Sequence, residues 1–301
     1  MTSEPPILTK DHGAVREICL NRPKKKNAFS LELANAFRDA LIQASSDETC
    51  RVLFVRGSGD MFSAGVDLNV FSRWTESIDG YNKLHAADEP SVAGDPSAAD
   101  DPSAADDPSA ADDPWTTISQ IVAVHETVRN CPKPTIACVH GKAVGMGMTL
   151  LPHFDLVYAA NDASFRAAFA DLGLVVELGS SFTLPRYLGP SRARELVYRG
   201  SLLTATEAAQ WGLVTRLFDP EQLVAESLSI AKEIAQKPAS ALRDSKKLFA
   251  MVDESAIREA ASEEHKLLAE RCRSEETRDI MRSILSKTRS SGQNQQSKKG
   301  V

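Results

Sequence analysis

The sequence contains no hydrophobic run long enough to cross a membrane. No stretch approaches the ~18 consecutive apolar residues of a spanning helix. The amino terminus, MTSEPPILTK, lacks the basic start and apolar run of a secretory signal and the arginines of a mitochondrial presequence. The final residues, KKGV, do not form a peroxisomal address. We therefore expect an intracellular, soluble protein with no readable targeting signal.

Cysteine is scarce and unpatterned. The five cysteines form no CxxC pair, and their number is odd. This favours free thiols in a reducing compartment over a disulfide framework. No histidines and cysteines share the spacing of a metal site, so we expect no bound metal.

Lysine and arginine are absent from residues 86–114, which contain nine acidic residues. In this segment DPSAAD occurs three times over residues 95–112 and begins again at Asp113. Proline every sixth residue breaks helices, the aspartate pairs repel each other, and no large apolar residue could line the core of a β-helix. We predict a disordered insertion in a surface loop, with a partner-binding segment as the alternative.

The acidic repeat also determines the sign of the net charge. Without its nine acids, the formal charge of −6 becomes about +3. The remainder is therefore mildly basic, which is compatible with a small ligand that carries phosphate. This charge is too low to indicate nucleic acid by itself.

Short buried strands alternate with helices over residues 1–220. ILTKDHGAVREICLN predicts a hairpin, and RVLFVRGS, TIACVHG and DLVYAA predict three buried strands. Ser30 is a predicted N-cap before a run of apolar residues at helical spacing, and 115–129 predicts an amphipathic helix. Strands alternating with helices indicate an α/β domain.

Strand patterns end near Pro220. Helical patterns cover residues 221–236, 239–252, 255–272 and 275–287, and the polar tail SSGQNQQSKKG is expected to be flexible. We therefore predict a helical region over 221–301 whose apolar faces pack against the core or against another subunit.

Two glycine-containing bends each follow a buried strand. The bend GDMFSAGVDL carries apolar residues, which suggests that a ligand docks close to its backbone. The bend GKAVGMGM leads into a helix that begins near Met146, and the first N–H groups of a helix have no intrahelical partner. If 64–66 and 145–147 face each other, two N–H groups can hold one oxygen, as in an oxyanion hole. Each bend alone is more typical of an ordinary turn.

Five segments, in this order, resemble the crotonase (enoyl-CoA hydratase/isomerase) superfamily. They are NRPKKKNAFS, GSGDMFSAGVDL, CPKPTIACVHGKAVGMGMTL, FDLVYAANDASFRAAFADLGL and GSLLTATEAAQWGLVTRLF. The resemblance covers about residues 7–290 apart from the repeat. It implies a spiral of ββα units, a carboxy-terminal helical region that builds trimers or hexamers, and binding of acyl-CoA thioesters. Coenzyme A would be part of the substrate, and no separate cofactor is expected.

The resemblance also assigns roles to residues of the two bends. The backbone N–H groups of Val66 and Met146 would hold the thioester oxygen. The residues expected to bind substrate are Ala64, Gly65, Asp67, Leu68, Gly145 and Lys25. Lys25 lies in the basic loop where the family usually receives the nucleotide end of coenzyme A, although a solvated basic face explains this loop equally well.

Some polar residues have structural alternatives. Asp67 and Asp171 are interpreted as turn caps or as partners of Arg166 or Arg186. His140 and His153 are interpreted as hydrogen-bonded core histidines.

Glu177 is the predicted general base. It follows residues 172–176, which are all apolar or glycine, and a buried carboxylate is costly unless it is paired or functional. An exposed loop glutamate is the alternative on local sequence alone. The resemblance is closest to the monofunctional Δ3,Δ2-enoyl-CoA isomerases of the peroxisomal type, which have their single catalytic glutamate at this place, before Gly-Ser-Ser and Leu-Pro.

Both carboxylates of the family's hydratases are missing. The resemblance places those two glutamates at positions that Thr149 and Phe169 occupy here. The dienoyl-CoA isomerase branch would also carry acids near these positions, plus one at Glu177, and only the last is present.

The leading hypothesis is an isomerase that shifts the double bond of 3-enoyl-CoA to trans-2 in the β-oxidation of unsaturated fatty acids. Such an enzyme would work in a peroxisome or mitochondrion of a eukaryote, and otherwise in the cytoplasm. Enoyl-CoA hydratase and dienoyl-CoA isomerase are the alternatives within the superfamily, and a non-catalytic acyl-CoA or RNA-binding scaffold is the alternative of another class. The basic loop 24–26 is the only feature that favours nucleic acid, and it lacks interleaved aromatic residues, so no nucleic-acid partner is expected.

Overall fold

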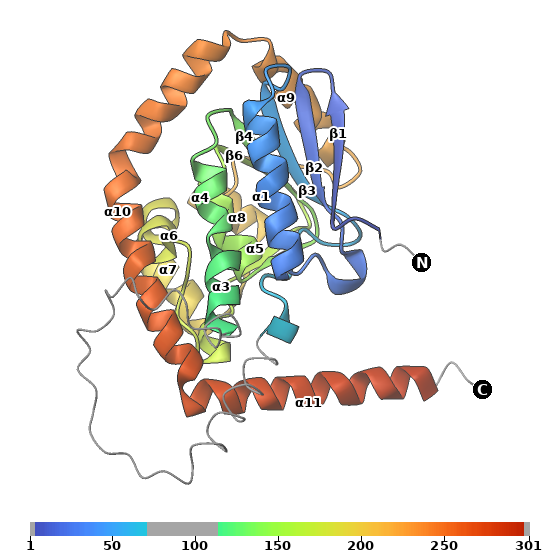
Figure 1. The fold of residues 1–301 in the computed structure, drawn as a ribbon, viewed down its shortest axis with the longest axis vertical. Coiled ribbons are helices and arrows are strands. Elements are labelled where there is room, and N and C mark those ends of the chain that lie inside the picture. The colour runs from blue at the N-terminus through green and yellow to red at the C-terminus, as the bar shows by residue number, and fades with distance from the viewer. Residues whose placement is uncertain (1–3, 71–113, 298–301) are drawn as a thin grey trace, which may run out of the picture.

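The structure is a computed structural model that describes residues 4–70 and 114–297 (Figure 1). The acidic repeat expected to be a disordered insertion lies outside these ranges. Among the described residues, no helix combines the length and the apolar character that crossing a bilayer requires.

A six-stranded sheet forms the centre of the fold. Its order is β1-β2-β3-β4-β6-β9. The strands are β1 (Ile7–His12), β2 (Val15–Leu20), β3 (Val52–Gly57), β4 (Thr135–Val139), β6 (Leu156–Ala160) and β9 (Arg216–Phe218). The first two form the predicted antiparallel hairpin, and the other neighbours are parallel. The buried strands of this sheet read as apolar runs because both faces are covered.

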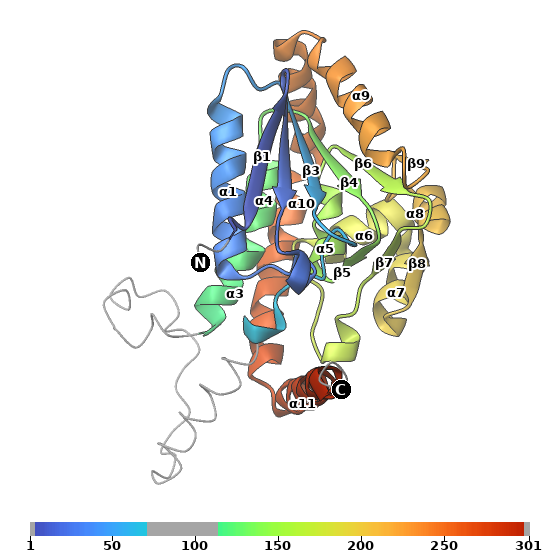
Figure 2. The same ribbon diagram turned by 90° about the vertical axis from the view of Figure 1, so that its right-hand side faces the viewer.

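The chain alternates between the large sheet and a second sheet of three strands. The second sheet consists of β5 (Lys142–Val144), β7 (Ser164–Arg166) and β8 (Leu202–Thr204). The chain passes from β4 to β5, from β6 to β7, and from β8 to β9, so each of these three turns contributes one strand to each sheet (Figure 2). This is the predicted α/β spiral, and the fold class is confirmed.

Helices cover both faces of the large sheet. Helix α1 (Leu31–Ser46) contacts β1 and β2, and α9 (Leu223–Ala235) contacts β2, β3, β4 and β6 from the other side (Figure 2). The hydroxyl of Ser30 accepts the N–H of Leu33 at 3.3 Å, so the predicted N-cap is present. The helix expected over 115–129 is divided into α3 (Pro114–Val122) and α4 (Val124–Arg129).

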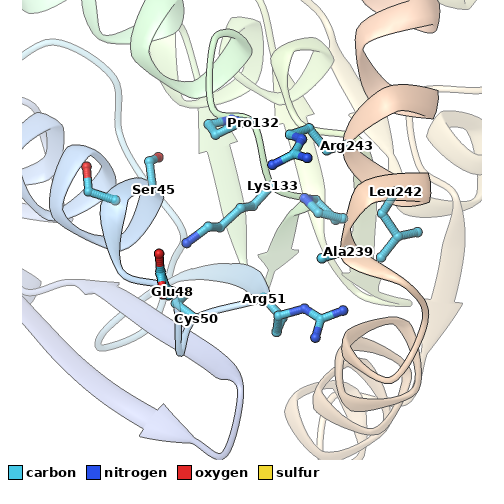
Figure 3. A pocket seen from close by; sticks show the side chains of 11 residues that line it. Ser45, Glu48, Cys50, Arg51, Pro132, Lys133, Ala239, Leu242 and Arg243 are labelled. Carbon is cyan, nitrogen blue, oxygen red and sulfur yellow. The ribbon is translucent and has the colours of Figure 1, made fainter.

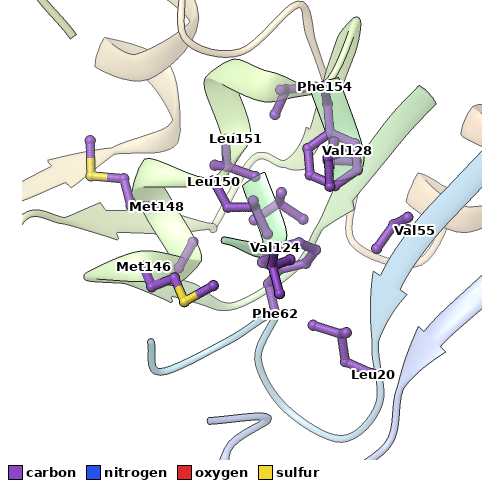
Figure 4. Packing of buried hydrophobic residues seen from close by; sticks show 14 of the residues in the cluster. Leu20, Val55, Phe62, Val124, Val128, Met146, Met148, Leu150, Leu151 and Phe154 are labelled. Atoms are coloured by element: carbon purple, nitrogen blue, oxygen red, sulfur yellow. The ribbon is translucent and has the colours of Figure 1, made fainter. Parts of the chain in front are cut away.

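The remaining helices of the core lie near the second sheet. Helix α5 (Met146–Thr149) follows β5 and leads into the short helical segment η5 (Leu151–His153). A second short segment, η6 (Ala170–Leu172), follows β7. After it come the helices α6 (Ser180–Leu188), α7 (Pro190–Arg199) and α8 (Ala205–Trp211). Side chains after the second bend, such as Met146 and Leu150, pack with Phe62 and Val124 in one buried cluster (Figure 4). All five cysteines are free thiols, as predicted, and all are buried.

Two long helices complete the fold. The patterns at 239–252 and 255–272 form one continuous helix, α10 (Ala239–Arg273), because no proline or glycine separates them. Helix α11 (Glu275–Ser297) continues ten residues past the predicted end at 287, so the tail expected to be flexible is helical through Ser297. Figure 1 shows α10 running along one side of the molecule, past α6 and α7, to α11.

Candidate active site

The two glycine bends lie directly against each other. Gly65 and Gly145 both adopt positive φ, +86° and +53°, which only glycine adopts at low cost. A Cβ atom on Gly65 would lie 2.7 Å from the carbonyl oxygen of Val144 and 3.2 Å from the nitrogen of Met146. A β-bridge between Ser63 and the strand that precedes the second bend joins the two segments. Gly65 is therefore required both by its conformation and by the close approach of the second bend.

Hydrogen bonds to neighbouring groups hold the backbone of both bends. The N–H of Phe29 donates to the carbonyl of Gly65 at 2.7 Å, and the N–H of Gly145 donates to the carbonyl of Arg166 at 2.9 Å. Met146 is the first residue of α5, so its own N–H has no partner within that helix. The N–H groups of Val66 and Met146 thus belong to two fixed backbone segments in contact, as a pair of oxyanion donors requires.

A pocket of about 510 Å³, here called the apolar cavity, lies beside the bends. Its walls include Leu68 of the first bend, Val144 of the second, Ile118 of α3, Leu172 of η6 and Leu268 of α10. Every residue predicted to bind substrate also borders it, namely Ala64, Gly65, Asp67, Leu68, Gly145 and Lys25. A largely apolar space with few polar groups is typical of a small-molecule site.

Asp67 borders the apolar cavity, but its carboxylate is already bound. One oxygen accepts from the guanidinium of Arg22 at 3.0 Å, and the other accepts from the backbone and side-chain nitrogens of Asn69, each at 3.0 Å. Asp67 therefore caps the turn after the first bend, which is one of the two structural interpretations of the sequence. Its cationic partner is Arg22 and neither of the predicted arginines.

The other polar residues with structural alternatives are also bound. Asp171 pairs with Arg166 at 2.9 Å, as predicted. His140 contacts the carbonyl of Gly59 at 3.0 Å, and Nε2 of His153 contacts the carbonyl of Leu178 at 2.7 Å, so each histidine binds a backbone group through one ring nitrogen. Nδ1 of His153 is buried without a hydrogen-bond partner.

Glu177 lies in the wall of the apolar cavity and is only 5% exposed. The alternative of an exposed loop glutamate is therefore wrong. Burial, followed by the charge of nearby Glu264, raises the pKa of Glu177 to about 8. A carboxyl group whose pKa lies near neutrality can both accept and return a proton at physiological pH.

The backbone after Glu177 has an uncommon conformation. Leu178 and Gly179 both lie in the left-handed region, at φ values of 64° and 71°. A leucine in this region costs about 1 kcal/mol or more, and such residues cluster at functional sites. The N–H and the hydroxyl of Ser180 both bind the carbonyl of Glu177, at 3.1 and 2.5 Å. The segment 178–181 is hereafter called the catalytic bend.

No acid occupies the two hydratase positions. Thr149 is fully buried, and its hydroxyl donates to the carbonyl of Gly145 at 3.3 Å. Phe169 borders the apolar cavity and is 5% exposed. Neither side chain titrates near neutral pH. Of the two buried carboxyl groups that border the apolar cavity, Asp67 is already bound by Arg22 and Asn69, so Glu177 is the candidate proton acceptor.

Two polar residues escaped the sequence analysis. Asn27 is fully buried, and its amide donates to the carbonyls of Ser58 and Met61 at 2.8 and 2.9 Å, which ties the basic loop to the first bend. Glu264 on α10 is buried beside Glu177. No local signal separates Glu264 from its exposed neighbour Glu263, because both occur in the same polar helical run.

A separate cavity of about 280 Å³ lies between the end of α1 and the start of α10 (Figure 3). The ammonium group of Lys133 donates to the carbonyls of Ala44 and Asp47, each at 2.6 Å, and so caps the end of α1. Burial raises the pKa of the Cys50 thiol, which keeps it protonated. Neither glycine bend nor Glu177 borders this cavity, although the carboxylate of Glu48 does, so it is separate from the candidate active site.

Comparisons with known proteins agree with this arrangement. A family model described as enoyl-CoA hydratase/isomerase matches residues 10–88 and 107–291. The chain is 32% identical over 281 residues to enoyl-CoA delta isomerase 2 of Rattus norvegicus, which covers 93% of this chain and 63% of that protein. It is 30% identical over 244 residues to the mitochondrial Delta(3,5)-Delta(2,4)-dienoyl-CoA isomerase of Homo sapiens, covering 79% of this chain and 66% of that protein.

A solved structure shares nearly the whole fold. The enoyl-CoA hydratase/isomerase of Pseudoalteromonas atlantica T6c superimposes with a TM-score of 0.74 at 29% identity, covering 94% of this chain and 97% of that chain. The chain spans less than two thirds of the length of the rat relative and almost all of the bacterial one. With its matched segments, its spiral of paired strands and its two facing glycine bends, the chain belongs to the enoyl-CoA hydratase/isomerase, or crotonase, family.

Proposed function

We propose that the chain is an isomerase that moves the double bond of a 3-enoyl-CoA to the trans-2 position, with Glu177 as the single proton carrier. The observation that supports this most strongly is one buried glutamate, with a pKa of about 8, in the wall of a cavity that also contains both glycine bends. The relatives named enoyl-CoA delta isomerase in Rattus norvegicus and Mus musculus, 32% and 29% identical, favour the same reaction.

The proposed reaction begins when the thioester oxygen accepts the N–H groups of Val66 and Met146. These donors stabilise the negative charge that develops on this oxygen, and one such donor typically contributes about 3 kcal/mol. The carboxylate of Glu177 removes a proton from C2 and forms a dienolate. The protonated Glu177 then returns the proton to C4, so the double bond moves and the enzyme is restored without a cofactor.

The absence of acids at the two hydratase positions favours isomerisation over hydration. Hydration requires a positioned water and delivery of a second proton, which two carboxyl groups serve well. Thr149 and Phe169 occupy the positions at which related enzymes would have acids, and neither side chain can transfer a proton near neutral pH. Dienoyl-CoA isomerase is the second candidate, because the human relative of that name is 30% identical and Glu177 matches the one acid that the resemblance retains.

Substrate entry and assembly follow from the same proposal. Lys25 borders the apolar cavity, where its charge suits a phosphate of coenzyme A.

The apolar side chains Leu248, Phe249, Met251 and Val252 of α10 are 63–79% exposed. We assign this strip of α10 to contacts between copies of the chain in a trimer or a dimer of trimers.

Replacement of the base provides the test. Glu177→Gln keeps the size of the side chain but cannot accept the proton, so isomerisation should fall roughly 10²–10⁴-fold. Binding of a non-reactive acyl-CoA should change far less, because the oxyanion donors are backbone groups. The measurement is turnover of purified protein offered 3-enoyl-CoA and 2-enoyl-CoA separately, with products separated by chromatography and identified by mass.

The controls for this test use neighbouring positions. Thr149→Ala and Phe169→Leu should keep turnover within about ten-fold of the parent, because neither side chain transfers a proton. Turnover near that of the parent in Glu177→Gln would remove this residue as the base. Conversion of 2-enoyl-CoA to a hydrated product as the main activity would favour the hydratase alternative.

A further inference from the structure

A second carboxylate is buried beside the catalytic bend. Glu264 belongs to α10, about 85 residues further along the chain than Gly179, and it is only 5% exposed. Its neighbour Glu263 is exposed and pairs with Lys266 at 2.8 Å on the outer face of the helix. A buried carboxylate carries a large desolvation cost, so its contacts indicate what it does.

Glu264 binds the backbone of the catalytic bend with both oxygens. Oε2 accepts the N–H of Gly179, and Oε1 accepts the N–H of Ser181, each at 2.6 Å. Gly179 is the N-cap of α6 and has no side chain to satisfy the first N–H groups of that helix. Glu264 thus caps α6 from a distant helix, with a negative charge at the end where the helix dipole favours one.

Helix α10 also packs tightly against the catalytic bend. A Cβ atom on Gly179 would lie 2.9 Å from Cγ2 of Ile257 and 3.2 Å from its carbonyl oxygen. The left-handed backbone at Leu178 and Gly179 is therefore held from the outside by α10, through a close contact and two short hydrogen bonds. Glu177 immediately precedes this backbone, so the direction of its side chain depends on it.

Glu177 borders two pockets. On one side is the apolar cavity, which Glu264 does not border. On the other is a space of about 250 Å³, whose walls include Glu264 and His125 at its buried end and Arg258 and Ser262 at the surface. Without a fixed backbone, the carboxyl group of Glu177 could turn toward this polar side and away from the substrate.

We propose that Glu264 is a positioning residue: by binding the N–H groups of Gly179 and Ser181, it holds the catalytic bend in the conformation that keeps the Glu177 carboxyl group in the apolar cavity. This inference rests on the proposed function of Glu177 as the base. Glu264 acts through the backbone and does not contact the substrate.

The carboxylate of Glu264 has a second effect. Burial raises the pKa of Glu264 itself, and the N–H groups that it accepts lower it, so the ionised form is the one that the catalytic bend stabilises. After burial, the charge of Glu264 is the cause that raises the pKa of Glu177. The ionisable groups on the elements around Glu177 are Glu264, His265, Arg258 and Cys272 of α10, His125, Glu126 and Arg129 of α4, His153 of η5, and Lys25, Lys26 and Asp67 at the apolar cavity. Burial lowers the pKa of His125 and of His153, so both are neutral near pH 7 and do not offset the charge of Glu264.

The test compares Glu264→Gln with Glu263→Gln in the full chain. In Glu264→Gln, kcat should fall about 10- to 100-fold because the base is misplaced. KM should stay within about three-fold, because Glu264 does not border the apolar cavity. The acid limb of the pH profile of kcat/KM should move to lower pH by about half a unit or more, because a like charge has been removed. Glu263→Gln should match the parent in all three measurements.

A second variant separates position from charge. Glu264→Asp keeps the charge but is one methylene shorter and cannot reach both N–H groups, so kcat should fall while the acid limb stays near that of the parent. Amide hydrogen exchange at Gly179 and Ser181 should be faster in both variants. If Glu264→Gln does not fold, kcat and amide exchange in Glu264→Asp test the positioning role instead.

Three outcomes would overturn the proposal. They are an unchanged kcat in Glu264→Gln, a lower kcat with unchanged exchange at the catalytic bend, and a loss that appears mainly in KM. Glu177→Gln identifies which proposal fails: if it is inactive while Glu264→Gln resembles the parent, only the positioning role is wrong. If Glu177→Gln is active, the proposed function itself is wrong.

Discussion

Glu177 is buried, and this changes both its acidity and its effect on folding. Burial disfavours the charged carboxylate, so the proton is held to a pH of about 8 in the folded protein. A stronger base removes a weakly acidic proton more readily, but only the ionised fraction can act. If Glu177 is the base, as proposed, a raised pKa makes its ionised form more reactive but leaves a smaller fraction of the enzyme ionised at neutral pH.

The pH dependence of catalysis should follow this ionisation. We expect kcat/KM for 3-enoyl-CoA to rise about ten-fold per pH unit below pH 8 and to level off above it, because the free enzyme must lose the proton of Glu177. A profile that is flat between pH 6 and 9 would contradict the assignment of the base. The measurement is initial rates at low substrate across this range.

The same shift should appear in the stability of the protein. The pKa of Glu177 is raised from 4.5 to about 8, so between these values the folded chain binds a proton that the unfolded chain has lost. The contribution of this group to the free energy of unfolding is therefore largest at acid pH and falls as the pH rises from 4.5 to 8. Glu177→Gln removes this ionisation, so its stability relative to the parent should increase with pH over that interval in urea unfolding.

At the scale of elements, helix α10 connects the site to the outer parts of the fold. Its inner end supplies Glu264 to the catalytic bend, and its outer half is anchored by Lys246. The ammonium group of Lys246 donates to Asp155 at 2.7 Å and to the carbonyl of Lys133 at 3.0 Å, with the side chain 11% exposed. One helix thus contacts both the start of the interior strands β4 and β6 and the bend that follows Glu177.

Removal of this anchor should destabilise the docking of α10. Lys246→Met should lower the free energy of unfolding by about 1–3 kcal/mol, the usual cost of losing a largely buried hydrogen bond to a charged group. Lys247→Met, at the exposed neighbouring position, is the matched control and should change stability by less than about 0.5 kcal/mol. Equal effects of the two substitutions in urea unfolding would show that the contact of Lys246 with Asp155 contributes nothing.

At the scale of the whole molecule, a large apolar surface on α10 is left uncovered in the single chain. Leu248, Phe249, Met251 and Val252 are adjacent on the helix and highly exposed. Contiguous exposed apolar side chains of this size are unusual on a monomer and mark contact surfaces.

We therefore expect the strip to control assembly. Phe249→Asp combined with Val252→Asp places two charges where apolar side chains would pack, and the protein should shift from trimer or hexamer toward monomer. Light scattering coupled to size exclusion measures this shift, and Glu259→Gln, an exposed position further along α10, serves as the control. A parent protein that is monomeric at micromolar concentration would refute the proposed assembly.

Much of this protein is determined locally. The periodicity of apolar residues predicted the hairpin, the buried strands and α1 with its Ser30 cap, because these elements depend on neighbours in the chain. The position of Gly65 and Gly145 after buried strands indicated both bends, since positive φ at a strand end favours glycine. The break between α3 and α4 and the continuity of α10 were missed, because packing against the core decides them and propensity is only a weak guide.

Tertiary structure decided what the local signals left open. Only the fold brings Gly65 within van der Waals contact of the second bend, and only the fold buries Glu177 so that its affinity for a proton rises. Asp67 pairs with Arg22 and not with Arg166 or Arg186, because the path of the chain determines which arginine lies close to it. Glu264 looks the same as Glu263 in the sequence, yet one face of α10 meets the catalytic bend and the other meets solvent. Burial and charge pairing depend on distances between residues far apart in the chain, and the sequence alone does not contain those distances.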